Sequence, residues 1–171
     1  MNKRVEQAIN EQINAELWSA YLYLSMSAHF ANEGLNGFAN WFRIQWQEET
    51  THAMKFFDYL VERGGKPELK PIKEVETKWN SPLHAFEETL KHELVVTSLI
   101  NNLMDIAIEE KDHATKGMLQ WFVDEQVEEE ANAQEIIDTL RLIKGEGNGL
   151  FMIDRELKQR VFVDATAKGA E

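Results

Sequence analysis

Four long segments of this chain carry apolar residues at alternating steps of four and three, and this spacing most constrains the fold. Residues at such steps share one face of an α-helix, so each segment is predicted to be a helix with an apolar seam that faces a core. The four segments cover roughly residues 3–33, 37–64, 82–110 and 113–144, and a shorter amphipathic one covers roughly 149–162. The predicted fold class is therefore all-α.

Glycines and prolines mark the ends of these segments. Ser81-Pro82 is typical of a helix start, with a serine N-cap followed by proline in the first helical position. Gly64-Gly65 and Gly145 are typical of helix ends. A length of 171 residues suits one domain with a single core. We predict one domain over residues 1–163 and a disordered tail over residues 164–171.

The linkers predict the path of the chain. The first two segments, and likewise the third and fourth, are joined by only a few residues, so each pair should form antiparallel neighbours. About sixteen residues separate the second segment from the third. When extended they reach about 50 Å, which exceeds the length of about 42 Å expected for a helix of about 28 residues. We therefore predict a four-helix bundle with a long crossover between its second and third helices, plus a short fifth helix.

Polar and charged residues interrupt the seams near the middle of every long helix, at Glu16, Glu49, His52, Glu93 and Glu129. With a rise of 1.5 Å per residue, the four glutamates fall within about 8 Å of the same depth in the bundle. Buried carboxylates without a counter-charge are strongly unfavourable, and no lysine or arginine lies on these seam positions. Two divalent metal ions would balance four carboxylates. Oxygen-rich ligation with imidazole suits iron or manganese.

The pair Glu49-x-x-His52 places both side chains on one helical face, so Glu49 could bridge two metals while His52 binds one. Such a pair alone is usually a solvated helix face, but four seam glutamates at matched depth favour a metal centre. Tyr23 follows Glu16 on the same seam and is either a core aromatic or a neighbour of the metals. The other histidines are expected at the surface or at helix ends: His29, His84, His92 and His113.

Three motifs resemble those of the prokaryotic non-haem ferritins: NEQINAE at residues 10–16, QEETTH at 47–52 and QWFVDEQVEEE at 120–130. The resemblance covers nearly the whole chain, from Asn2 to about Gln159. It implies a homo-oligomeric hollow shell of twenty-four subunits, a 24-mer, that acts in iron storage. In such a shell Fe(II) is oxidised by oxygen or peroxide in a ferroxidase reaction and kept as a ferric mineral.

The resemblance also implies a role for each matched residue. The ligands of the first iron are Glu16, Glu49 and His52. The ligands of the second are Glu49, Glu93 and Glu129, with Gln126 beside it. Tyr23 matches the tyrosine next to this diiron centre, and we count it with the catalytic residues. An outer, third iron site is implied at Glu48, Glu125 and Glu128.

Two departures exclude related proteins. Bacterioferritin carries a second Glu-x-x-His on the fourth helix, where this chain has Gln126 and Glu129, and Thr50 stands where its haem methionine would be. We therefore predict no haem. The chain has no cysteine, which excludes disulfides and the iron–thiolate centre of a rubrerythrin.

The net charge of −12 argues against nucleic acid as a partner, because such binding needs cationic contacts to phosphate. No stretch is apolar enough to span a membrane, and the start lacks the apolar run of a signal peptide, so we predict no membrane partner and a cytoplasmic protein. Two alternatives stay open at this point. One is a small diiron oxidase that acts on an organic substrate without storing iron, and the other is a non-catalytic helical assembly module.

Overall fold

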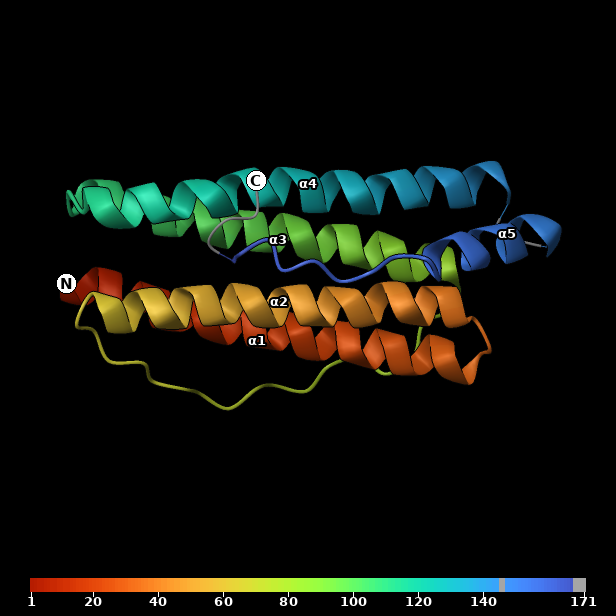
Figure 1. Cartoon of the computed structure of the whole chain (residues 1–171), viewed down its shortest axis with the longest axis horizontal. Helices are drawn as coiled ribbons and strands as arrows, with labels where there is room; N and C mark the ends of the chain where they lie inside the picture. Colours follow the sequence, from red (N-terminus) through yellow and green to blue (C-terminus); the bar gives the residue numbers. More distant parts are fainter. Residues whose placement is uncertain (145–146, 168–171) are drawn as a thin grey trace.

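The computed structural model describes residues 1–144 and 147–167, and the described part contains five helices (Figure 1). Their bounds are α1 Lys3–Asn32, α2 Asn36–Glu62, α3 Pro82–Glu109, α4 His113–Leu142 and α5 Gly147–Leu157. The first four lie side by side as a bundle, and α5 lies at one end of it. This confirms the predicted all-α bundle with a short fifth helix. In the described ranges, no helix combines the length and the low polarity that a membrane span requires.

The long crossover between α2 and α3 is also confirmed. After α2 the chain returns along α1 to the opposite end of the bundle, in an extended path on the outside of the hairpin (Figure 1). Side chains of α1 fix this path by donating to backbone carbonyls of the loop. Asn10 Nδ2 donates to Lys66 at 3.0 Å, Trp18 Nε1 to Glu74 at 3.4 Å and Ser25 Oγ to Glu76 at 2.6 Å. The two hairpins α1–α2 and α3–α4 therefore pack against each other.

Helix ends follow the local signals in most places. Ser81 Oγ accepts from the backbone N–H of His84 at 3.1 Å, and Pro82 opens α3, as predicted. Gly64 has φ +72°, the left-handed conformation that ends a helix. Lys144 takes a left-handed conformation after α4 with φ +58°, while the predicted stop at Gly145 lies outside the described residues.

Two apolar clusters fill the bundle, and the polar seam residues lie between them. One cluster, towards α5, contains Phe30, Phe42 and Phe86, and the other, towards the far end, contains Phe56 and Phe122. One position differs from the sequence prediction: the alternating four-three spacing of residues 113–144 predicts Ile136 on the core seam. Along α4 the buried residue is Ile137, which is 1% exposed, whereas Ile136 only packs at the edge of the cluster.

Helix α5 packs against the end of its own bundle. Ile153 is buried there, and Asp154 Oδ1 accepts from the first backbone N–H groups of α2, those of Gly37 at 2.8 Å and Phe38 at 3.1 Å. A Cβ on Gly37 would lie 1.6 Å from the Asp154 carbonyl oxygen, so this contact requires glycine. The fifth helix is shorter than predicted and ends at Leu157 instead of 162.

Of the tail predicted to be disordered, the described residues 164–167 form a turn in which Asp164 Oδ1 accepts from the Thr166 backbone N–H at 2.9 Å. Residues 168–171 lie outside the described part. The domain bounds of 1–163 and 164–171 stay a prediction.

Candidate metal centre

The five seam residues converge in the middle of the bundle. Glu16 comes from α1, Glu49 and His52 from α2, Glu93 from α3 and Glu129 from α4. Each is almost completely buried, with exposures of 1%, 1%, 3%, 1% and 4% in that order. Each helix presents them on its core face because they continue the spacing of the apolar residues before and after them.

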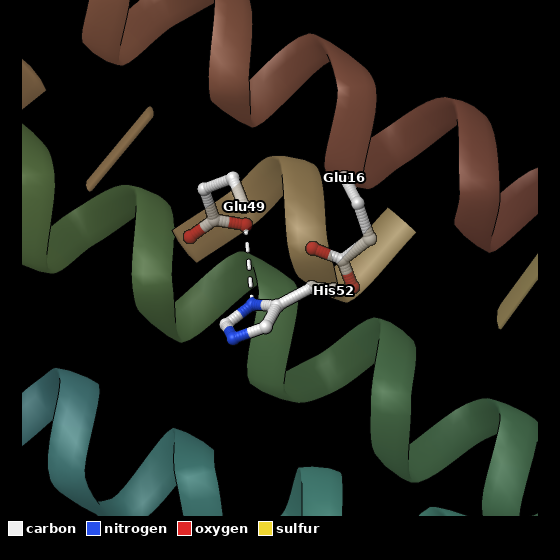
Figure 2. A group of neighbouring side chains, drawn as sticks. All are labelled: Glu16, Glu49 and His52. Carbon is white, nitrogen blue, oxygen red and sulfur yellow. Dashed lines mark ion pairs between the residues drawn. The ribbon is translucent and has the colours of Figure 1, made fainter. Parts of the chain in front are cut away.

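The first group of potential ligands is formed by Glu16, Glu49 and His52, whose ligand atoms lie within 4.8 Å of one another. Figure 2 shows the two carboxylates and the imidazole turned towards a common point. His52 Nδ1 is 3.6 Å from Glu49 Oε2. Glu16 Oε2 and Glu49 Oε2 are buried without any hydrogen-bond donor. Buried oxygens of this kind need a partner, and a divalent cation would supply one.

His52 also belongs to a second group, with Glu125 and Glu129. Its Nε2 atom is 3.8 Å from Glu125 Oε1. Glu129 is buried, whereas Glu125 is only partly buried. The imidazole therefore lies between the inner carboxylates and those on the outer side of α4.

Glu93 is held differently from the other seam glutamates. Its carboxylate accepts a hydrogen bond from the hydroxyl of Tyr23 and another from Gln126 Nε2 at 3.2 Å. Among the described residues it belongs to neither group of close ligand atoms. The structure thus places Tyr23 and Gln126 as neighbours of Glu93. From the sequence, Tyr23 was either a core aromatic or a neighbour of the metals, and Gln126 was implied beside the second iron only by the family resemblance.

Two amide donors beside the centre were not singled out from the sequence. Gln12 Nε2 donates to Glu16 Oε1 at 2.8 Å, and Gln45 Nε2 donates to Glu129 Oε2 at 2.9 Å. Gln45 lies on the apolar seam of α2, which is a signal that could have found it. Gln12 lies one turn before Glu16, where only the i, i+4 spacing indicates a contact.

Burial sets the protonation of these groups in the absence of metal. It raises the pKa of Glu49 and of Glu129 well above the usual range, and the charge of Glu93 adds to both shifts. Burial likewise raises the pKa of Glu93 to about 7 and lowers the pKa of His52 to about 4. The imidazole is thus neutral at pH 7, the form that binds metals. The carboxylates need a cation to become fully ionised.

The residues of the predicted outer site lie on the α2 and α4 surfaces beside this centre. Glu48 and Glu125 are partly buried and Glu128 is exposed. Glu48 Oε2 pairs with Arg160 Nη2 at 2.7 Å. No pattern in the sequence indicated that Arg160 pairs with Glu48, because the two partners are 112 residues apart.

His92, which was expected at the surface or at a helix end, is partly exposed and contacts α1. Its Nε2 lies 2.8 Å from Ser19 Oγ of α1, and its ring centroid is 6.0 Å from that of Tyr23. Burial lowers the pKa of His92 to about 4.

A helical bundle with buried carboxylates and one imidazole at its middle defines a carboxylate metal-binding bundle. Comparison with known proteins narrows this class. The model of the ferritin-like domain matches residues 6–143. The bacterial non-heme ferritin of Bacteroides fragilis is 48% identical over 160 residues, which cover 94% of this chain and 99% of that protein. That of Campylobacter jejuni is 40% identical over 92% of this chain and 95% of its own.

Solved structures agree. The open pore ferritin from the archaeon Archaeoglobus fulgidus superimposes with a TM-score of 0.93 at 50% identity, over 94% of this chain and 99% of that one. The chain therefore belongs to the ferritin family, among its non-haem members. Ferritins are iron-storage proteins with a ferroxidase centre, and the buried glutamate and histidine cluster fits that activity.

Proposed function

We propose that Glu16, Glu49 and His52 bind one Fe(II) and that Glu49, Glu93 and Glu129 bind a second, with Gln126 beside it. The observation that carries this proposal is the pair of buried oxygens without a donor, Glu16 Oε2 and Glu49 Oε2, in two residues that each bring a ligand atom within 4.8 Å of one on His52. Fe(II) is the substrate here. Each ion gives one electron to oxygen or peroxide, and the products leave as ferric iron for storage.

The residues around the ligands orient them for this reaction. The amides of Gln12 and Gln45 each donate to one oxygen of a carboxylate and leave its other oxygen for metal. Tyr23 and Gln126 hold Glu93 on the side of α3. The two apolar clusters above and below keep water away from the site. A low-polarity setting of this kind strengthens the attraction between carboxylate and cation.

Glu48, Glu125 and Glu128 are proposed as an outer, third iron site. It is supported by the group of His52, Glu125 and Glu129, in which an outer carboxylate and an inner one lie near the same imidazole. His52 Nε2 lies 3.8 Å from Glu125 Oε1, so iron could pass between the inner and the outer site at this point. We therefore expect the outer site to act on later turnovers and not on the first oxidation.

Ferritins form shells, and we propose twenty-four copies for this one, in the cytoplasm. Support comes from α5, whose inner face covers the bundle end while Phe151 and Met152 are 62% and 70% exposed. Apolar side chains exposed on one helix face are suited to contact with other subunits. The test is sedimentation of the purified protein at physiological salt. A monomer or dimer as the sole species would contradict the shell.

The storage reaction is tested by adding Fe(II) in air to the same preparation. We expect a large particle that turns amber and stays in solution as ferric mineral builds up inside it. A small species that oxidises iron and stores none would favour an oxidase acting on an organic substrate instead. A protein that takes up no metal would contradict both.

A further inference from the structure

The segment after α5, residues 158–167, here called the C-terminal strap, runs back along the bundle from the α5 end towards its middle (Figure 1). Asn40 on α2 holds its start, because Asn40 Nδ2 donates to the carbonyl oxygens of Leu157 at 3.1 Å and Arg160 at 3.0 Å. Further along, Asp164 lies near Lys55 of α2, and the two attract each other. The strap therefore follows α2 over the face that carries Glu48.

Arg160 of the strap places a fixed cation against the outer carboxylates. Its Nη2 atom is 2.7 Å from Glu48 Oε2, its Nη1 donates to the Trp41 carbonyl oxygen at 3.3 Å, and its guanidinium lies 4.8 Å from the centroid of the Trp41 ring. Both charged side chains are largely covered, with 24% of Arg160 and 19% of Glu48 exposed. Three separate contacts thus hold the guanidinium where a metal ion would approach Glu48.

A metal ion and this guanidinium compete for the same oxygen. Glu48 Oε2 cannot accept from Arg160 and also bind a metal closely, and two cations at this distance repel each other. The charge of Arg160 also reaches Glu129, one of the inner carboxylates. Displacement of the guanidinium is feasible, because the strap has no helix or sheet hydrogen bonds of its own beyond the turns at its two ends.

We propose that Arg160 is an intramolecular competitor for the cation of the outer carboxylate site, so that metal binds at Glu48 only when the guanidinium leaves. The strap then sets the affinity of the outer site and the ease with which iron passes through it. Arg160 is a specificity-determining residue for iron traffic, not a ligand. This inference rests on the proposed outer site at Glu48, Glu125 and Glu128.

The test is calorimetric titration of the assembled, metal-free protein with Zn(II), which binds oxygen and imidazole ligands and has no redox chemistry. The outer binding step is identified as the one that the triple variant E48Q/E125Q/E128Q lacks. In R160Q this step should tighten by about fivefold, since a partly exposed ion pair contributes about 1 kcal/mol. R160K keeps the positive charge and should stay close to the unmodified protein. K158Q is the matched control, because Lys158 is an exposed cation of the same strap, and it should change the affinity by less than about twofold.

Each other outcome overturns the inference in a distinct way. Equal Zn(II) affinity in R160Q and the unmodified protein, with the outer step present in both, overturns the competitor role and leaves the outer site intact. Weaker outer binding in R160Q would make Arg160 a structural support of the site, which is the opposite of the proposal. If the triple variant binds as much Zn(II) as the unmodified protein, the outer site itself is absent and the competitor role falls with it.

Discussion

Glu49 and Glu48 are consecutive residues of α2, and the regions that they represent, the core centre and the outer carboxylates, differ in how their charge is balanced. Glu49 is 1% exposed, and one of its oxygens has no donor. Glu48 is partly exposed and pairs with the guanidinium of Arg160. One residue is about 100° around a helix, enough to move a carboxylate from the core to a face where basic side chains reach it.

Glu125, the second outer carboxylate, also has a basic side chain of the protein nearby. Glu125 is attracted by Lys55, whose ammonium lies 4.5 Å from the centroid of the Trp121 ring, much as Arg160 lies over Trp41. The described inner carboxylates have only neutral donors, the amides of Gln12, Gln45 and Gln126 and the hydroxyl of Tyr23. The comparison teaches that the core depends on a metal for its counter-charge, whereas the outer face already has cations from the protein.

The largest expected effect is on the core. Glu49→Ala removes the proposed bridge between the two irons and should slow the first Fe(II) oxidation at least about a hundredfold. Loss of a residue that only hydrogen-bonds to a ligand usually costs about ten- to a hundredfold, and loss of a ligand should cost more. The fold should survive, since removal of a buried, unpaired carboxylate relieves strain in the metal-free protein. Stopped-flow absorbance with two irons per subunit measures the rate. Glu48→Ala, one residue away, is the control and should keep the first turnover fast. Unmodified rates in Glu49→Ala would refute the bridge.

The second prediction concerns pH. In the metal-free protein Glu93 holds its proton up to a pKa of about 7, whereas in the unfolded chain it loses the proton near its ordinary value of 4.5. The folded state therefore binds more protons between these values, so the free energy of unfolding should fall as pH rises from about 4.5 to 7. The loss from this one group is about 3 kcal/mol.

Glu93→Gln should flatten this part of the stability curve, because glutamine stays neutral throughout. Urea unfolding of the metal-free protein at several pH values measures it. Glu128→Gln, at an exposed outer position, is the control and should leave the slope unchanged. Stability that rises with pH over this window would contradict the buried, unpaired state of the core.

A smaller effect, on metal affinity, is expected from a residue that hydrogen-bonds to a metal ligand without binding metal itself. Gln45→Ala removes the amide that donates to Glu129 Oε2 at 2.9 Å. Without that donor Glu129 is harder to ionise and less well oriented, so metal affinity at the core should fall about tenfold. Zn(II) calorimetry measures the loss. Gln134→Ala is the matched control, since that amide donates to Asp138 on the exposed face of α4. Equal losses in both variants would mean that Gln45 acts through helix stability alone.

The smallest effect should come from the outer set. Replacement of Glu48, Glu125 and Glu128 together by alanine should leave the first two-iron turnover fast and change the iron-to-oxygen stoichiometry or the later turnovers. Repeated additions of Fe(II) in the stopped-flow instrument distinguish the two phases. A triple variant that matches the unmodified protein through every addition would mean that these residues are only a solvated acidic face.

Several features of the fold were predictable because they depend on one segment at a time. The repeat of apolar residues fixes which side of a helix meets the core, and so it placed Glu16, Glu49, Glu93 and Glu129 inside. The Ser81 cap and the left-handed Gly64 are likewise local. The predicted seam of α4 misses one buried position after Ala133, because a strict seven-residue repeat drifts by about 20° per heptad against a straight helix. The buried position therefore moves from Ile136 to Ile137, while Leu140 stays buried on the predicted spacing.

The sequence by itself determined four long helices and a carboxylate on each core face, since helix periodicity and the cost of burying charge act within a single segment. Only the tertiary structure decided which group caps α2 and which cation pairs with the outer carboxylate of Glu48. Asp154 on α5 caps α2, which has no side-chain cap of its own, and Arg160 reaches Glu48 across 112 residues of chain. Such contacts depend on where the chain turns after α4 and α5, and no pattern within one helix encodes the distance between two segments that meet only after folding.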